Sequence, residues 1–140
     1  MATVLTQTYS SNTAITFDLS SLGTSSTFVA GRESTQIDNT STMYDDCLVN
    51  VKGITGHAST APTVGQYIGL WVWGADTSLA TTAIDVLDGT DSAETLSHVS
   101  VLNSLKFAAA PAVTVATAAL VYYIQPFSVA ALFGGVMPKF

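Results

Sequence analysis

The sequence predicts an all-β fold, a single antiparallel β-sandwich that carries at most one or two short helical turns. Short runs of alternating apolar and polar residues recur along the chain, which is the pattern of half-buried strands. Clusters of Gly, Asn, Asp, Ser and Pro separate these runs about every eight to twelve residues, a spacing typical of sandwiches and barrels. The 140 residues suffice for one domain with a hydrophobic core, and no helix of three turns is indicated.

Two segments alternate most clearly. Residues 12–19 do so throughout, and in residues 46–52 the side chains of Cys47, Val49 and Val51 share one face opposite polar neighbours. Both segments are predicted to be strands with one face in the core. Cys47 is the only cysteine, which excludes an intrachain disulfide and a zinc site built from cysteines, and we interpret it as a small buried hydrophobic residue.

Two further segments, residues 66–74 and 120–127, are apolar on both faces. A strand with two apolar faces is buried on both sides, and two such strands are many for one small domain. We therefore expect another chain to cover part of the sheet surface. The candidate interface residues are the large aromatic side chains of these two segments: Tyr67, Trp71, Trp73, Tyr122, Tyr123 and Phe127.

Weaker signals complete the predicted fold. Residues 128–133 are expected to form a helical turn that Ser128 caps and Gly134 ends, and residues 91–97 a second turn. Residues 1–11 are predicted to be an N-terminal arm or edge strand, and residues 12–140 the sandwich domain. A jelly roll is the first choice of topology and an immunoglobulin-like sandwich the second. The weaker strands are predicted at residues 3–9, 27–30, 34–38, 84–86, 102–108 and 112–117.

The composition favours a surface that other chains cover. Charged residues make up 10% of the chain and hydrophobic residues 48%, whereas average soluble domains carry about 25% charged residues. Serine and threonine replace the missing ions, and burying a hydroxyl costs less free energy than burying an unpaired charge. A net charge of −6 with four scattered basic residues argues against binding to nucleic acid or to anionic lipid.

Two sequence features bear on membranes and secretion. Prolines, polar residues and the Gly134–Gly135 pair interrupt the uncharged stretch between Lys106 and Lys139, which argues against a membrane-spanning helix. Residues 1–7 lack the basic and long apolar regions of a signal peptide, so we expect no secretory leader.

The sequence contains no motif for catalysis or for a cofactor, and we expect a non-enzymatic protein without a metal. His57 and His98 lie in separate segments, and no Gly-x-Ser-x-Gly sequence supports a hydrolase triad. Asp45 and Asp46 would point to opposite faces of a strand and so would not form an acid/base pair. One acidic cluster lacks the spacing of an EF-hand, and we interpret it as a solvated turn: Asp76, Asp85, Asp88 and Asp91.

Several short runs resemble small virion proteins of tailed bacteriophages, and the resemblance covers most of the chain from Thr27 onward. It is a likeness of several runs and not one diagnostic motif. The runs are AGREST at residues 30–35, IDNT at 37–40, YDD at 44–46, IGLWVWG at 68–74 and YYIQPFSVA at 122–130.

Such proteins look like capsid decoration, or cement, proteins. The resemblance implies a jelly-roll-like sandwich, often a homotrimer, that sits on the outer capsid surface after assembly in the host cytoplasm. It implies that the subunit bridges neighbouring major capsid proteins, with no catalysis and no cofactor. The alternative function is a carbohydrate-binding module of a phage tail or fibre, in which the same aromatic residues form a sugar-binding platform.

Overall fold

The structure is a computed structural model that describes residues 13–15, 19, 22, 25–39, 44–55, 61–75 and 83–135. The predicted N-terminal arm, the strand predicted at residues 3–9 and most of that at residues 12–19 lie outside these ranges, as do His57 and Asp76.

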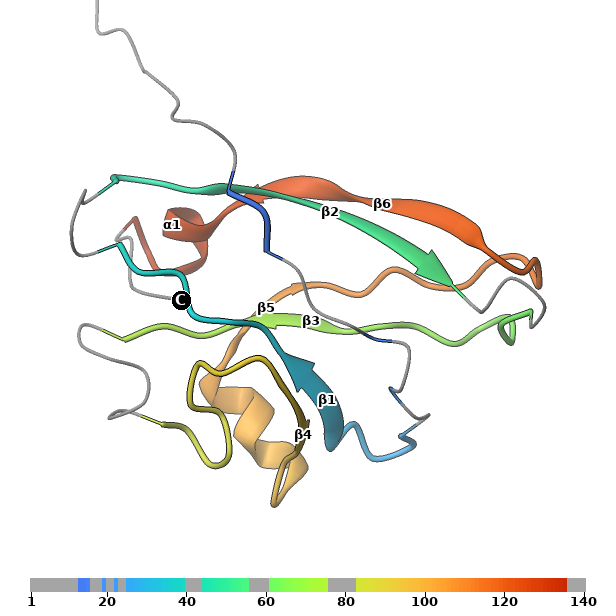
Figure 1. Cartoon of the computed structure of the whole chain (residues 1–140), viewed down its shortest axis with the longest axis horizontal. Coiled ribbons are helices and arrows are strands. Elements are labelled where there is room, and N and C mark those ends of the chain that lie inside the picture. The colour runs from blue at the N-terminus through green and yellow to red at the C-terminus, as the bar shows by residue number, and fades with distance from the viewer. Residues whose placement is uncertain are drawn as a thin grey trace, which may run out of the picture.

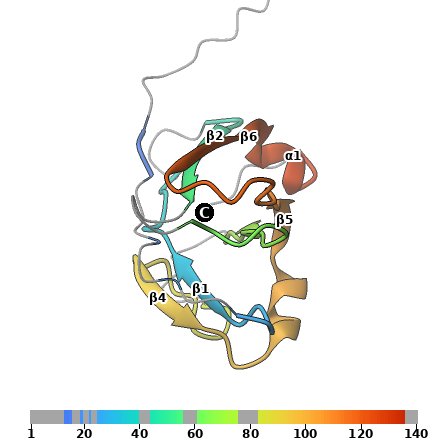
Figure 2. The same ribbon diagram turned by 90° about the vertical axis from the view of Figure 1, so that its right-hand side faces the viewer.

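Six antiparallel strands pair two by two in the described residues, and each pair joins a strand that ends by residue 72 to one that begins after residue 91. The strands β1 (Ala30–Glu33) and β4 (Ser92–Thr95) pair, as do β2 (Leu48–Thr55) and β6 (Leu120–Ser128), and β3 (Leu70–Val72) and β5 (Lys106–Ala109). Figures 1 and 2 both place the β3–β5 ribbon between the other two ribbons. The all-β prediction is confirmed, while the jelly-roll topology stays a prediction, since the described residues form three separate two-stranded ladders.

The β2–β6 ribbon is the longest, and both of its strands were predicted. Val49 and Val51 of β2 are half-buried while Leu48, Asn50 and Lys52 are exposed, which confirms the predicted faces. The ladder shifts register once, between Val49 and Val51, where β6 contains an extra residue. Pro126 lies in this bulge, a position where a strand tolerates a residue that has no backbone N–H.

The β3–β5 ribbon continues beyond the named strands. Tyr67 and Ala112 form a bridge in the same register as the pair Leu70 and Ala109. The Val113 N–H donates to the Gln66 carbonyl at 2.7 Å, which extends the ladder toward residue 65. The strand predicted at residues 66–74 therefore forms in part, and the one predicted at 112–117 is reduced to the bridge at its first residue.

Two short helices are present in the described residues, the 3₁₀ helix η2 (Val99–Ser104) and the α-helix α1 (Val129–Leu132). The Ser128 hydroxyl accepts the Ala131 N–H at 2.9 Å, and Gly134 follows with a φ of +73°. The helical turn predicted at residues 128–133 is confirmed, with its predicted cap and its predicted terminator.

The helical turn predicted at residues 91–97 is wrong, because this segment forms β4. The sequence Ser-Ala-Glu-Thr has no apolar alternation that would predict a strand. The strand forms because β1 offers it a ladder partner, and an ion pair between Arg32 and Asp91 at 2.8 Å fixes the start of the pairing. Tertiary context decides the structure of such weak segments.

The weaker strands were predicted with wrong bounds. The segment at 102–108 is helical through Ser104, because the His98 ring accepts the Ser100 N–H and starts η2. Residues 34–38 lie outside any strand, and β1 begins only at Ala30 because residues 26–28 turn. The segment at 84–86 turns tightly, with a bridge between Ile84 and Leu87.

The buried core is small. The buried hydrophobic side chains of the described residues are those of Leu87, Leu96, Val113, Val129 and Ala130. A β-ribbon of two strands is marginal on its own, so the three ribbons depend on packing against one another. In the ranges that the structure covers, no helix is long and apolar enough to cross a membrane.

Candidate functional site

One face of the β2–β6 ribbon carries exposed apolar side chains next to the polar Asn50 and Lys52. Because opposite residues of an antiparallel pair share a face, Lys52 and Tyr123 lie side by side, with Leu48 and Val121 on the same face. Leu48 is 53% exposed, Val121 41% and Tyr123 74%. Lys52 is the only charged residue of either strand, so this face (hereafter the outer face) has the apolar character of an interface.

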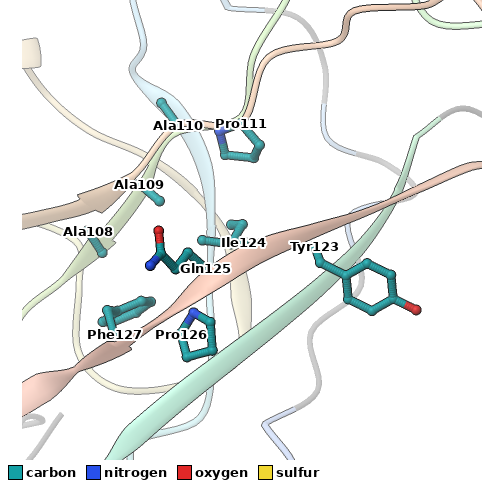
Figure 3. A pocket seen from close by; sticks show the side chains of 9 residues that line it. All are labelled: Ala108, Ala109, Ala110, Pro111, Tyr123, Ile124, Gln125, Pro126 and Phe127. Carbon is teal, nitrogen blue, oxygen red and sulfur yellow. The ribbon is translucent and has the colours of Figure 1, made fainter.

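An open groove lies between residues 108–111, at the end of β5, and residues 123–127 of β6. Its volume is about 440 Å³, and Figure 3 shows Gln125 extending toward the alanines while the Tyr123 ring points away. No side chain of the lining carries a formal charge. The groove therefore favours a neutral, largely apolar occupant.

A second exposed aromatic pair joins the loop before β1 to the segment before β3. The rings of Phe28 and Tyr67 stack with centroids 5.4 Å apart, although both side chains remain more than a third exposed. Phe28 has a φ of +56°, in the left-handed region that bulky residues rarely adopt. The Ser25 carbonyl accepts the Phe28 N–H and the Ser25 hydroxyl accepts the Val29 N–H, which together support this turn.

Trp71 is held by neighbours of the same ribbon. Its ring meets Phe107 edge-on at 5.7 Å, across the pair that the two residues form in the β3–β5 ladder. The ring also lies against Gly69, where an added Cβ would fall 2.0 Å from a ring carbon. Phe107 remains exposed, so the outside of this aromatic pair is uncovered.

Trp73 is tied to a buried carboxylate. Glu33 is buried and accepts the indole Nε1–H of Trp73 at 3.1 Å. Its two oxygens also accept the backbone N–H groups of Asp88 at 3.1 Å and Gly89 at 2.9 Å. Burial raises the pKa of Glu33 above its ordinary value, although these three hydrogen bonds act to lower it. Trp73 therefore stabilises the fold around β1.

Asp46 has a comparable structural role beside α1. One carboxylate oxygen accepts the Cys47 N–H at 2.7 Å, the Ser128 hydroxyl at 2.8 Å and the Ala130 N–H at 3.0 Å. Burial alone would raise the pKa of Asp46, but these hydrogen bonds together hold it below its ordinary value. The carboxylate thus joins the start of β2 to the start of α1.

The predicted interface residues fall into three places. Tyr123 and Phe127 line the groove, Trp71 and Trp73 lie half-buried in and after β3, and Tyr67 stacks on Phe28. The side chain of Tyr122 lies outside what the structure describes. Sequence reasoning missed the exposed residues Leu48, Phe28 and Phe107, and it missed the roles of Glu33 and Asp46.

The residues weighed for chemistry take structural roles where they are described. Asp88 accepts the Thr90 N–H within a turn, Asp85 accepts the Ser97 N–H, and Asp91 pairs with Arg32. His98 contacts Ser100 at the start of η2. Within the described ranges, no three histidine, cysteine or acidic side chains gather in a way that would hold a metal ion.

Comparison with known proteins identifies no relative of this chain. No protein-family model, no curated protein and no solved structure matches the chain.

Proposed function

We propose that this chain is a structural subunit of a bacteriophage particle, a decoration protein that bridges neighbouring major capsid subunits on the outer surface, as a homotrimer and without catalytic activity. The observation that carries the structural role is the distribution of apolar side chains. In the described residues twelve large hydrophobic side chains are exposed, whereas the buried hydrophobic ones are five. Three of the exposed side chains, those of Leu48, Val121 and Tyr123, share the outer face, and contiguous exposed apolar side chains mark interaction sites.

The capsid assignment comes from the sequence resemblance, and the surface chemistry is compatible with it. A clamp stabilises a shell by burying apolar area across a joint, at roughly 25 cal/mol per Å² before the entropic costs of association. The outer face offers such area and contains one charge, that of Lys52. Symmetry repeats each modest contact many times, so avidity compensates for weak single contacts.

Substitution of Tyr123 tests the proposal. Tyr123→Ser removes the most exposed large hydrophobic side chain of the described residues. It is expected to leave the unfolding temperature of the dissociated subunit unchanged. It is expected to weaken the trimer, measured by sedimentation, and the binding to capsids, measured by the heat that releases their DNA. The matched control is Asn103→Ser on η2, also exposed. The proposal would be refuted if the parent chain stayed monomeric at every concentration and did not bind capsids.

A carbohydrate-binding module is the second candidate, and the exposed stack of Phe28 and Tyr67 favours it. Aromatic rings that remain open to solvent are the platforms on which sugars stack. Glycan-array binding that is saturable and lost in Tyr67→Ala, while Tyr123→Ser retains it, would establish this function. If the parent chain gives no glycan signal, the carbohydrate-binding function is rejected.

A further inference from the structure

The groove between residues 108–111 and 123–127 lies beside two strands, β5 and β6, that each pair with one strand in the described part of the chain. Each ribbon contains two strands in the described residues, so β5 and β6 each have one edge without a strand beside it. The groove is lined by β5, β6 and the residues that follow β5, and by no residue of β2 or β3. It therefore opens on the side of both ribbons that carries these unpaired edges (Figure 3).

An edge of this kind binds an extended chain. Backbone N–H and C=O groups of an edge strand pair with an added strand, while pockets beside it take alternate side chains. Residues 123–127 of β6 at about 3.3 Å each give an edge of roughly 16 Å, which a strand of five to seven residues would cover. Pro126 has no N–H to donate, so at this position the added strand could bond only to its carbonyl. The uncharged lining selects a neutral strand, since burial of an unpaired charge costs several kcal/mol or more.

We propose that the groove takes residues 3–9 of a second copy of this chain, added as a strand along the edge of β6. Residues 1–17 contain no charged side chain, and residues 3–9 (TVLTQTY) have the strand pattern that the groove requires. Exchange of an arm between identical subunits is a low-cost route to a closed oligomer. The inference rests on the proposed assembly function and names the contact that holds the copies together.

Crosslinking between two single-cysteine chains tests the contact. Both full-length chains carry Cys47→Ser; one adds Thr6→Cys and the other, of a different mass, adds Gln125→Cys, an exposed groove residue. After mixing and mild oxidation, we expect a mixed disulfide dimer several-fold more abundant than with the control acceptor Ser104→Cys, which is exposed on η2 outside the groove. Equal yields with the two acceptors would overturn the proposal.

Charge substitutions provide an independent test. Gln125→Glu and Gln125→Lys are both expected to weaken the oligomer several-fold, because either charge must lose water when the groove is filled. Asn103→Glu and Asn103→Lys on η2 are the controls and should have no effect. Oligomers unchanged by both groove charges would also count against the contact.

Sedimentation of the same samples distinguishes failure of the arm contact from failure of the proposed assembly function. An oligomer without selective crosslinking rejects the arm contact and leaves the assembly function standing. A chain that is monomeric at all concentrations rejects both. Crosslinking only within one chain, in the double variant Thr6→Cys with Gln125→Cys, rejects a second copy as the occupant.

Discussion

At the residue scale, two carboxylates hold separate segments of the chain together, and the fold shifts their pKa values in opposite directions. Glu33 is a buried acceptor for the indole of Trp73 and for two backbone N–H groups, whereas Asp46 accepts three hydrogen bonds near the surface. Their pKa values shift in opposite directions, and so their contributions to stability depend on pH with opposite sign.

Asp46 stabilises the fold above the ordinary pKa of an aspartate. Because its pKa is lowered in the folded chain, its contribution to the free energy of unfolding is lost as pH falls through the folded pKa. Asp46→Ala is expected to cost about 1–2 kcal/mol at pH 7, the usual effect of losing a cap of this kind. Urea titrations at several pH values would check this, and a difference that stays constant down to pH 2 would contradict it.

The contribution of Glu33 to stability has the opposite pH dependence. Its raised pKa means that the folded chain binds the proton more tightly, so its stabilising contribution is full below about pH 4.5 and is lost as pH rises through the folded pKa. Glu33→Gln removes this titration, and about 1–3 kcal/mol is lost if one N–H is left without an acceptor. The advantage of the parent over the variant should shrink as pH rises, measured by Trp fluorescence during unfolding.

At the scale of elements, Gly31 in β1 and Gly69 before β3 differ in the space that an added side chain would find. A Cβ at Gly69 would fall 2.0 Å from the Trp71 ring, while nothing lies within 4 Å of one at Gly31. Gly69→Ala is expected to cost about 1–3 kcal/mol through displacement of the indole. Gly31→Ala is expected to be neutral or to stabilise by about 0.4–1 kcal/mol. Equal melting temperatures for the two variants would contradict this account.

The elements that the sequence predicts best are those whose own side chains determine them. The alternation of β2 reflects a strand with one half-buried face, and Ser128 with Gly134 reflects the backbone chemistry of a helix end. The strand β4 was unpredictable because its partner β1 dictates it. The segment Val-Ser-Val-Leu at the start of η2 has the pattern of a strand, yet it is helical, with the His98 ring accepting the Ser100 N–H at its start.

The candidate site was predicted in part for the same reason. Tyr67, Tyr123 and Phe127 can be chosen from the sequence because large aromatic rings contribute much contact area both in cores and at interfaces. The groove itself depends on how β5 approaches β6, and no local pattern encodes this approach. Glu33 was missed because a single acid before Ser34 has no distinguishing neighbour in the sequence.

At the scale of the whole molecule, assembly is expected to depend little on ions. The groove lining carries no formal charge and the outer face one, so raising NaCl from 0.1 to 1 M, where the screening length falls from about 10 Å to 3 Å, should leave the oligomer intact. Sulfate should strengthen it, because excluded salts favour apolar burial. Dissociation in NaCl, followed by sedimentation, would indicate that unseen ion pairs hold the subunits.

The pairing of every early strand with a late one has a consequence for biosynthesis. Since β1, β2 and β3 find their partners beyond residue 91, a nascent chain that ends near residue 75 has none of these ladders. Ribosomes add about 5–20 residues per second, so its apolar segments wait for seconds without partners. The early strands therefore stay open to aggregation until the later half of the chain has been synthesised.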